Sequence, residues 1–171
     1  MFLLIMIIDL SKSTFLRGFA FEEFANNLLR KQNNNSFIFR TMRFANLDTM
    51  TGYFNLDLSS IKNIDTLKKY YKCIDLIEFV VSRIDENKVK HVSAINVYEV
   101  KSKVSSRKRS YDISRECYER YKKLNGLGFN SKLISIHMFE NWKFSFNVYD
   151  ILNYRNFCFR KNSRNLFKHK K

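Results

Sequence analysis

The hydrophobic pattern of the chain predicts a helix near its beginning. Apolar side chains recur there at helical spacing, at Phe21, Phe24, Ala25 and Leu28. Ser13 or Thr14 can cap this helix, which is expected to run to about Lys31. Glu22 then lies on the edge of the buried face rather than on its solvent side. The polar residues 32–36 end the helix.

Two β-rich runs, residues 73–84 and 92–101, predict a hairpin across the polar stretch 85–90. A three-residue loop centred on Asn87 sets Ile77 against Val97 and Phe79 against Ile95. A loop one residue shorter would change every one of these pairs, and a bulge would shift some of them. The predicted register therefore depends on the length of the loop.

The same register sets Asp75 against Glu99, and alternation places Lys101 on the same face. A two-residue loop would instead oppose Asp75 to Tyr98 or Val100. Charges in apolar strands cost several kcal/mol unless they are paired or bind a metal. Two opposed carboxylates also repel each other. A divalent metal together with Lys101 would relieve both penalties.

The rest of the chain supplies further strands and one more helix. Residues 37–40, 131–139 and 143–148 are expected to be strands, and so is the apolar start, residues 1–8. Asp112 is expected to cap a helix whose face carries Ile113, Cys117, Arg120, Tyr121 and Leu124. Residues 41–71 are expected to form an insertion with a short helix. The order is helix, strand, hairpin, helix, strand, which predicts an α/β fold.

Composition indicates one folded domain over residues 1–171, because 45% of the residues are hydrophobic and 16% are aromatic. The apolar residues 1–8 are too few for a membrane helix and lack the basic flank of a leader, although an incompletely recognised leader stays an alternative. The three cysteines form no C-x-x-C pair, which favours reduced thiols in a cytoplasmic protein with no membrane association.

Charge points to a polyanionic partner, because 31 Lys and Arg face 16 Asp and Glu, a net charge of +15. The positive charge is concentrated in a C-terminal extension of about residues 150–171. A second cluster begins at the hairpin's last charged residue and consists of Lys101, Lys103, Arg107, Lys108 and Arg109. DNA is the expected partner and RNA an alternative, while a generally basic protein is the plainer interpretation.

These residues resemble the PD-(D/E)xK nuclease superfamily. Asp75 and the run Glu99-Val100-Lys101 take the places of its Asp and its Glu-x-Lys, and Gly18 followed by Glu22 is similar to the first helix of archaeal Holliday-junction resolvases. The resemblance implies a restriction-endonuclease-like αβββαβ core with a mixed central sheet flanked by helices. The chain departs from the pattern in having Ile74 where Pro is frequent, a longer segment 41–71, and no four-cysteine cluster.

The resemblance also implies roles for the residues. Asp75, Glu99 and the Val100 carbonyl would coordinate Mg²⁺ or Mn²⁺, Lys101 would orient or deprotonate the attacking water, and Glu22 would hold a metal-bound water. The basic residues after Lys101 would contact phosphates. The expected activity is metal-dependent hydrolysis of DNA by an endonuclease, with a structure-selective junction resolvase as one form and a homodimer as the assembly that symmetric cleavage favours.

Each assignment has an alternative. Glu99 and Lys101 could be a solvated pair, Asp75 a turn cap, and Glu23 could take the place of Glu22. Glu78 lies on the opposite strand face and is expected to be a peripheral partner for a Lys. An ordinary role is expected for each of His91, His137 and His169. At the level of function, the alternatives are a non-catalytic nucleic-acid-binding protein and an RNA-processing nuclease.

Overall fold

The strands form a mixed central sheet, and helices flank it. The computed structural model describes residues 14–32, 35–104, 111–139, 143–154 and 157–159. Its elements are α2 (Thr14–Gln32), β1 (Ser36–Arg40), η1 (Thr41–Arg43), α3 (Leu47–Phe54), β2 (Leu56–Asp57), α4 (Ile64–Tyr70), η2 (Tyr71–Cys73), β3 (Leu76–Ile84), β4 (Lys90–Val104), β5 (Tyr111–Ile113), α5 (Arg115–Gly126), β6 (Asn130–Met138), β7 (Phe144–Asp150) and β8 (Phe157–Phe159). The predicted α/β class is confirmed.

The central sheet has six strands, of which five follow the order β1-β3-β4-β6-β7, and β2 pairs with β4. The pairs β1–β3, β3–β4 and β6–β7 are antiparallel, whereas β4–β6 and β2–β4 are parallel. The parallel pair β4–β6 requires a crossover, which α5 supplies. A separate two-stranded sheet joins β5 to β8.

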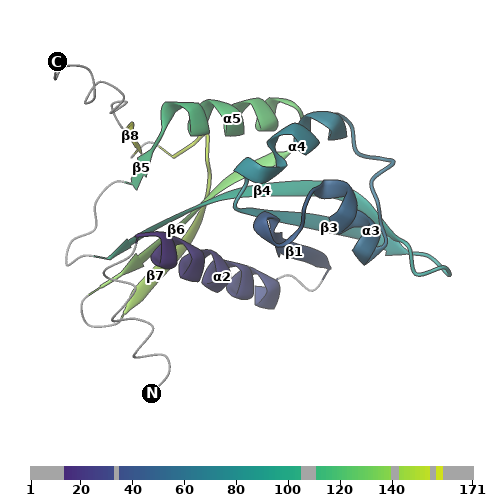
Figure 1. The fold of residues 1–171 in the computed structure, drawn as a ribbon, viewed down its shortest axis with the longest axis horizontal. Coiled ribbons are helices and arrows are strands. Elements are labelled where there is room, and N and C mark those ends of the chain that lie inside the picture. The colour runs from purple at the N-terminus through teal and green to yellow at the C-terminus, as the bar shows by residue number, and fades with distance from the viewer. Residues whose placement is uncertain (1–13, 33–34, 105–110, 140–142, 155–156, 160–171) are drawn as a thin grey trace, which may run out of the picture.

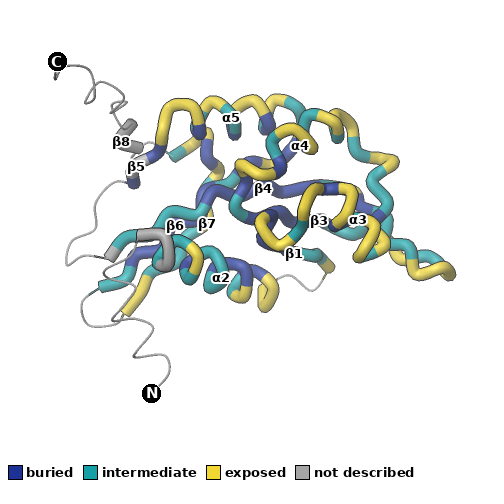
Figure 2. Tube along the Cα trace, viewed as in Figure 1, coloured by how far each residue is buried: buried dark blue, intermediate teal, exposed yellow. Residues whose placement is uncertain are grey.

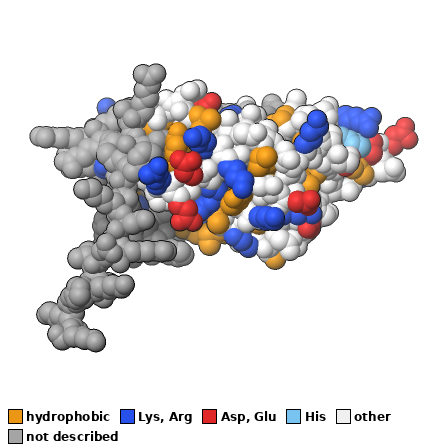
Figure 3. Space-filling view, turned by 90° about the horizontal axis from the view of Figure 1, so that it is seen from above, with side chains coloured by type: hydrophobic (Ala, Val, Ile, Leu, Met, Phe, Trp, Pro, Cys, Tyr) orange, Lys and Arg blue, Asp and Glu red, His pale blue; other side chains and the backbone are white. Residues whose placement is uncertain are grey.

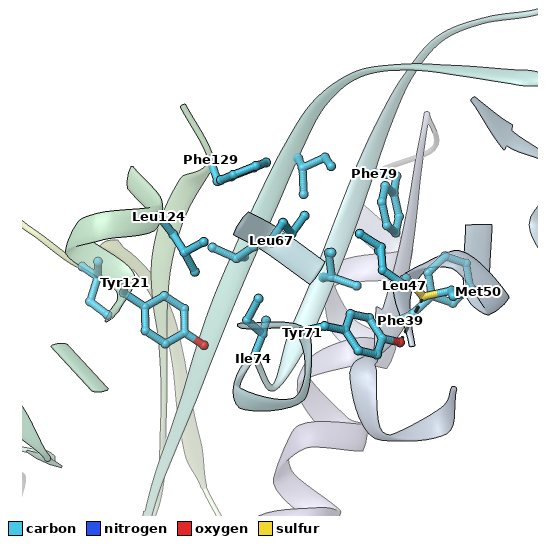
Figure 4. Packing of buried hydrophobic residues seen from close by; sticks show 14 of the residues in the cluster. Phe39, Leu47, Met50, Leu67, Tyr71, Ile74, Phe79, Tyr121, Leu124 and Phe129 are labelled. Carbon is cyan, nitrogen blue, oxygen red and sulfur yellow. Dashed lines mark hydrogen bonds between the residues drawn. The ribbon is translucent and has the colours of Figure 1, made fainter. Parts of the chain in front are cut away.

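Helices cover both faces of the sheet (Figure 1). On one face α2 packs against a cluster that includes Ile38, Leu76 and Tyr98. On the other face α3, α4 and α5 pack against a larger cluster (Figure 4). Accordingly, long stretches of β3, β4 and β6 are buried, and the exposed residues gather on the helices and at the hairpin tip (Figure 2).

The first helix begins and ends within one residue of the predicted bounds. Its buried positions are Phe21, Ala25, Asn26 and Leu29, so the stripe is rotated slightly from the predicted one, in which Leu28 was the last member. Glu22 lies at the edge of this stripe, with 18% of its side chain exposed, as the spacing predicts.

The insertion is more structured than the sequence predicts. It contains two α-helices, two 3₁₀ turns and the strand β2 rather than one short helix. Leu47, Met50, Leu67 and Tyr71 are fully buried in the larger core cluster (Figure 4). The Tyr71 hydroxyl donates a hydrogen bond to the Met50 sulfur at 3.7 Å, and burial raises the pKa of Tyr71 to about 12. The insertion therefore covers one face of the sheet.

The start of α5 differs from the prediction. Asp112 lies in the strand β5, and Ser114 caps the helix, because its side-chain oxygen accepts a hydrogen bond from the Cys117 backbone N–H at 3.0 Å. Cys117, Tyr121 and Leu124 are buried as expected, whereas Ile113 belongs to the strand. The predicted strand at residues 1–8 lies outside the described residues. None of the helices described has both the length and the apolar character that a membrane span needs.

Candidate active site

The β3–β4 hairpin has the predicted register near its open end. Ile77 pairs with Val97 and Phe79 with Ile95. The loop is closed by the Asp85 N–H, which donates to the Val89 carbonyl at 3.0 Å, and Lys88 takes a left-handed conformation at φ 60°. This is the three-residue hairpin loop that the pairing requires.

Asp75 lies one residue before the first residue of β3 and is tied to β4 twice. Its backbone N–H donates to the Tyr98 carbonyl at 3.2 Å, and its carboxylate accepts a hydrogen bond from the Val100 N–H at 2.7 Å. Asp75 is therefore hydrogen-bonded to both neighbours of Glu99, and Glu99 is the residue that the register sets opposite Asp75. The predicted proximity of Asp75 to the Glu-x-Lys run is confirmed.

Glu99 and Lys101 continue the face of β4 that carries Val97, towards α5. Glu99 is only 5% exposed and forms an ion pair with Lys101, whose side chain is 30% exposed. Burial and then the charge of Glu99 raise the pKa values of the Cys117 thiol and the Tyr121 hydroxyl on α5. The pair is therefore enclosed by α5 and is not the solvated surface pair that the sequence left as an alternative.

The electrostatics of Asp75 are unfavourable for a charged carboxylate. Burial raises its pKa well above the usual value, the charge of Glu99 raises it further, and Glu22 adds a smaller effect in the same direction. The Val100 N–H and Lys101 act in the opposite direction without cancelling these effects. Ionising Asp75 beside Glu99 therefore favours the binding of a cation.

Lys101 responds to the same charges in the opposite sense. Burial alone would lower its pKa, but the charge and the hydrogen bond of Glu99, together with the charge of Asp75, raise it overall. Lys101 is therefore a cation that donates hydrogen bonds at neutral pH.

Glu22 approaches this region from α2, on the other face of the sheet. Its carboxylate accepts a hydrogen bond from the Arg40 guanidinium at 2.8 Å, and Arg40 is only 2% exposed. Glu23, the sequence alternative, lies 3.6 Å from Arg40 and forms an ion pair with the exposed Arg43 at 2.8 Å. Glu22 thus neutralises a buried arginine while its charge still acts on Asp75.

Sequence reasoning missed Arg40, although a signal was present. Arg40 ends the apolar run 37–40. A charged residue is as unexpected there as Asp75 and Glu99 are in their own apolar runs. Glu78 was also misplaced: it lies on the opposite face from Asp75, as predicted, but it is 2% exposed rather than peripheral. The Tyr98 hydroxyl and the Asn96 amide donate hydrogen bonds to its carboxylate. Glu78 therefore anchors the strand that carries Glu99.

Of the described histidines, His91 lies away from this site. His91 lies between the carboxylates of Asp57 and Asp85, at 2.8 and 3.2 Å, near the far end of the hairpin. His137 is buried in β6, and His169 lies outside the described residues.

The predicted basic surface is only partly described. Lys103 follows Lys101 on the same face of β4, whereas Arg107, Lys108, Arg109 and the residues after 159 lie outside the described residues. In the view from above, Lys and Arg side chains alternate with acidic and apolar ones on the part of the face that is described (Figure 3).

Two further cations, Lys72 and Arg120, lie close to the residues that precede Asp75. The Arg120 guanidinium donates to the Cys73 carbonyl at 3.2 Å, and the Lys72 ammonium donates to the Phe44 carbonyl at 2.8 Å. Lys72 belongs to η2, which ends two residues before Asp75.

The residues suit Mg²⁺ better than a metal that needs a full protein cage. Within the described ranges, no group of three or more His, Cys, Asp and Glu side chains is arranged to hold a metal ion. Mg²⁺ prefers hard oxygen ligands and is commonly held by one or two carboxylates while it keeps several waters. Asp75 and Glu99 are the two carboxylates that could hold such an ion, because a cation between them would remove their mutual repulsion.

No family model matches the sequence, and a search of the curated proteins and of the solved structures finds no match either.

Proposed function

We propose that this protein is a metal-dependent nuclease that hydrolyses DNA phosphodiester bonds, with Asp75, Glu99 and Lys101 as its central residues. The observation that carries the proposal is that these three side chains lie together at the open end of the hairpin. Two carboxylates that repel each other and one lysine come from β4 and from the residue that precedes β3, and one of the carboxylates is ion-paired with the lysine. Apart from the insertion and the short strand β5, the order α2, β1, β3, β4, α5, β6 supports a restriction-endonuclease-like core.

Each residue has a distinct task in this proposal. Asp75 and Glu99 would hold Mg²⁺, with the Val100 carbonyl as a backbone ligand, and Glu22 would bind a water of the ion. Such an ion lowers the pKa of a bound water and stabilises negative charge on the phosphate. The Lys101 ammonium, held by Glu99, orients the attacking water or neutralises a phosphate oxygen. The Val100 N–H fixes the Asp75 carboxylate.

The test compares wild type with Asp75→Asn and with the control Asp65→Asn, which changes a carboxylate that is 89% exposed on α4. Labelled linear duplex DNA, single-stranded DNA, a four-way junction and RNA of matching sequence are incubated with Mg²⁺ or with EDTA. We expect wild type and Asp65→Asn to cleave DNA only with Mg²⁺, and Asp75→Asn to bind the same DNA without cleaving it. Cleavage of RNA alone would replace the DNA assignment.

Cleavage by Asp75→Asn at the wild-type rate would remove Asp75 from the site and with it the proposed mechanism. Binding without cleavage by every variant would favour a non-catalytic nucleic-acid-binding protein. One feature supports this second function: Arg40 already neutralises Glu22, so that fewer acidic oxygens remain for a metal.

A further inference from the structure

Phe19 is an exposed aromatic ring whose orientation is fixed from behind. It is 51% exposed on α2, and the Arg40 guanidinium carbon lies 3.8 Å from its ring centroid. Arg40 is itself immobilised, because it is 2% exposed and donates two hydrogen bonds to Glu22, at 2.8 and 3.2 Å. The cation thus occupies one side of the ring, and half of the residue remains open to solvent.

The ring is connected to the backbone of Asp75 through Arg40 and its neighbour Thr41. Phe19 precedes Glu22 by one helical turn on the same face of α2, and the charge of Glu22 acts on Asp75. On the strand side, Thr41 follows Arg40 directly, and its backbone N–H donates to the Asp75 carbonyl at 3.3 Å. Phe19 and Asp75 are therefore linked by contacts through Arg40 and Thr41 and by the charge of Glu22.

The surroundings of Phe19 favour a nucleobase over an apolar protein surface. Arg43, with a side chain that is 49% exposed, is ion-paired with Glu23 on α2, and Lys72 lies three residues before Asp75. A base joined to its phosphate presents a flat π-face to an aromatic ring and a negative charge to cations. A purely apolar partner would have to cover Glu23 and Arg43 as well, at a desolvation cost.

We propose that Phe19 is a stacking platform for one unpaired nucleobase, and that the preferred substrate carries an unpaired nucleotide beside the bond to be cut. A base inside a regular duplex stacks on its neighbours, so that its face is not free for the ring. An unpaired nucleotide at a junction, bulge or end can place its base on Phe19 while the adjoining phosphate approaches Asp75. The inference rests on the proposed function, because it specifies the substrate of that site.

The experiment measures binding by fluorescence anisotropy in EDTA, so that no cleavage occurs. The probes are two labelled DNA duplexes of the same sequence, one fully paired and one with a single unpaired nucleotide. The proteins are wild type, Phe19→Leu, Phe19→Trp and the control Tyr53→Leu, which removes a 77% exposed ring on α3. Circular dichroism verifies that each variant is folded.

We expect Phe19→Leu to bind the duplex with the unpaired nucleotide about 5- to 100-fold more weakly and the paired duplex as wild type does. Phe19→Trp keeps the preference because it keeps a ring, and Tyr53→Leu leaves both affinities unchanged. Equal affinities of Phe19→Leu and wild type for the unpaired probe would overturn the platform. An equal loss of affinity for both probes would also overturn it. So would a wild-type dimer that dissociates when Phe19 is replaced by Leu.

A parallel cleavage assay with Mg²⁺ separates this inference from the proposed function. Cleavage by wild type with no dependence of binding on Phe19 would support the nuclease and overturn the platform. A Phe19-dependent preference without cleavage by wild type would support the platform as a binding site and overturn the nuclease.

Discussion

The replacement Asp75→Asn should stabilise the metal-free protein, although it removes a central residue of the proposed site. Asparagine keeps an oxygen that can accept the hydrogen bond from the Val100 N–H, and its amide can donate to Glu99. The substitution therefore removes a partly buried charge and a repulsion while it retains the contact that fixes the side chain. Most substitutions of a buried residue do the opposite.

The size of the effect follows from the spacing across the hairpin. Opposed residues in an antiparallel pair lie about 5 Å apart, and two like charges at that distance repel by about 3 kcal/mol at an effective dielectric constant of about 20. Lys101 and the Val100 N–H compensate for part of this. We expect a net gain of about 1–2 kcal/mol in the free energy of unfolding, or roughly 2–8 °C in Tm for a domain of this size.

The pH dependence has a definite sign. Because the pKa of Asp75 is raised in the folded state, the folded protein holds this proton more strongly than the unfolded chain does. Wild type should therefore lose stability relative to Asp75→Asn as the pH rises above the unfolded value of about 4 and through the folded pKa. Below pH 4 the two proteins should differ little.

The assay is thermal and urea unfolding in EDTA between pH 4 and 8, repeated with Mg²⁺. Wild type should gain about 2.7 kcal/mol at a Mg²⁺ concentration 100 times the Kd, and Asp75→Asn should gain much less. A variant that is less stable than wild type in EDTA at pH 8 would refute the electrostatic argument. An equal response of both proteins to Mg²⁺ would place the ion elsewhere.

Three further outcomes are expected from other parts of the fold. Arg40→Met should destabilise the protein by about 3–5 kcal/mol in urea unfolding, because it leaves Glu22 partly buried without its cation; a loss below 1 kcal/mol would contradict this. Ser114→Ala should cost about 1 kcal/mol in the same assay, because it removes the cap of α5, and an unchanged value would argue against the cap. Hydrogen bonds from Ser59 lower the pKa of Asp57, a hydrogen bond from Val89 lowers that of Asp85, and contacts with His91 lower both further. Wild type should therefore lose more stability than the double variant Asp57→Asn/Asp85→Asn as the pH falls from 5 to 2. Parallel curves of stability against pH for the two proteins would contradict the assignment.

The sequence predicted the hairpin and its charged residues well because both are governed by local rules. Alternation in β3 and β4, together with one loop length, determines which residues oppose each other, so that Asp75 could be paired with the Glu-x-Lys run before any contact was known. The helix α2 was predicted for the same reason, since its apolar spacing spans several turns.

The elements that were predicted poorly depend on contacts between distant residues. Asp112 and Ser114 are both suitable helix caps, and the chain uses Ser114 because Asp112 pairs with Cys158 in the small sheet. The short helices of the insertion have few apolar residues each and are stabilised by the core they cover. Burial of Arg40 likewise depends on α2, which supplies Glu22.

The insertion is fastened at its base. Thr41, its first residue, donates its backbone N–H to the Asp75 carbonyl, and its hydroxyl donates to the Ile74 carbonyl. The chain therefore leaves the sheet and returns to it at nearly the same point, and the position of Asp75 is set by this junction and by β4. Added or removed residues within an exposed turn between the ends would cost little in loop entropy. The exposed turns between Thr41 and Ile74 are thus places where the length of the chain can change while the geometry around Asp75 stays the same.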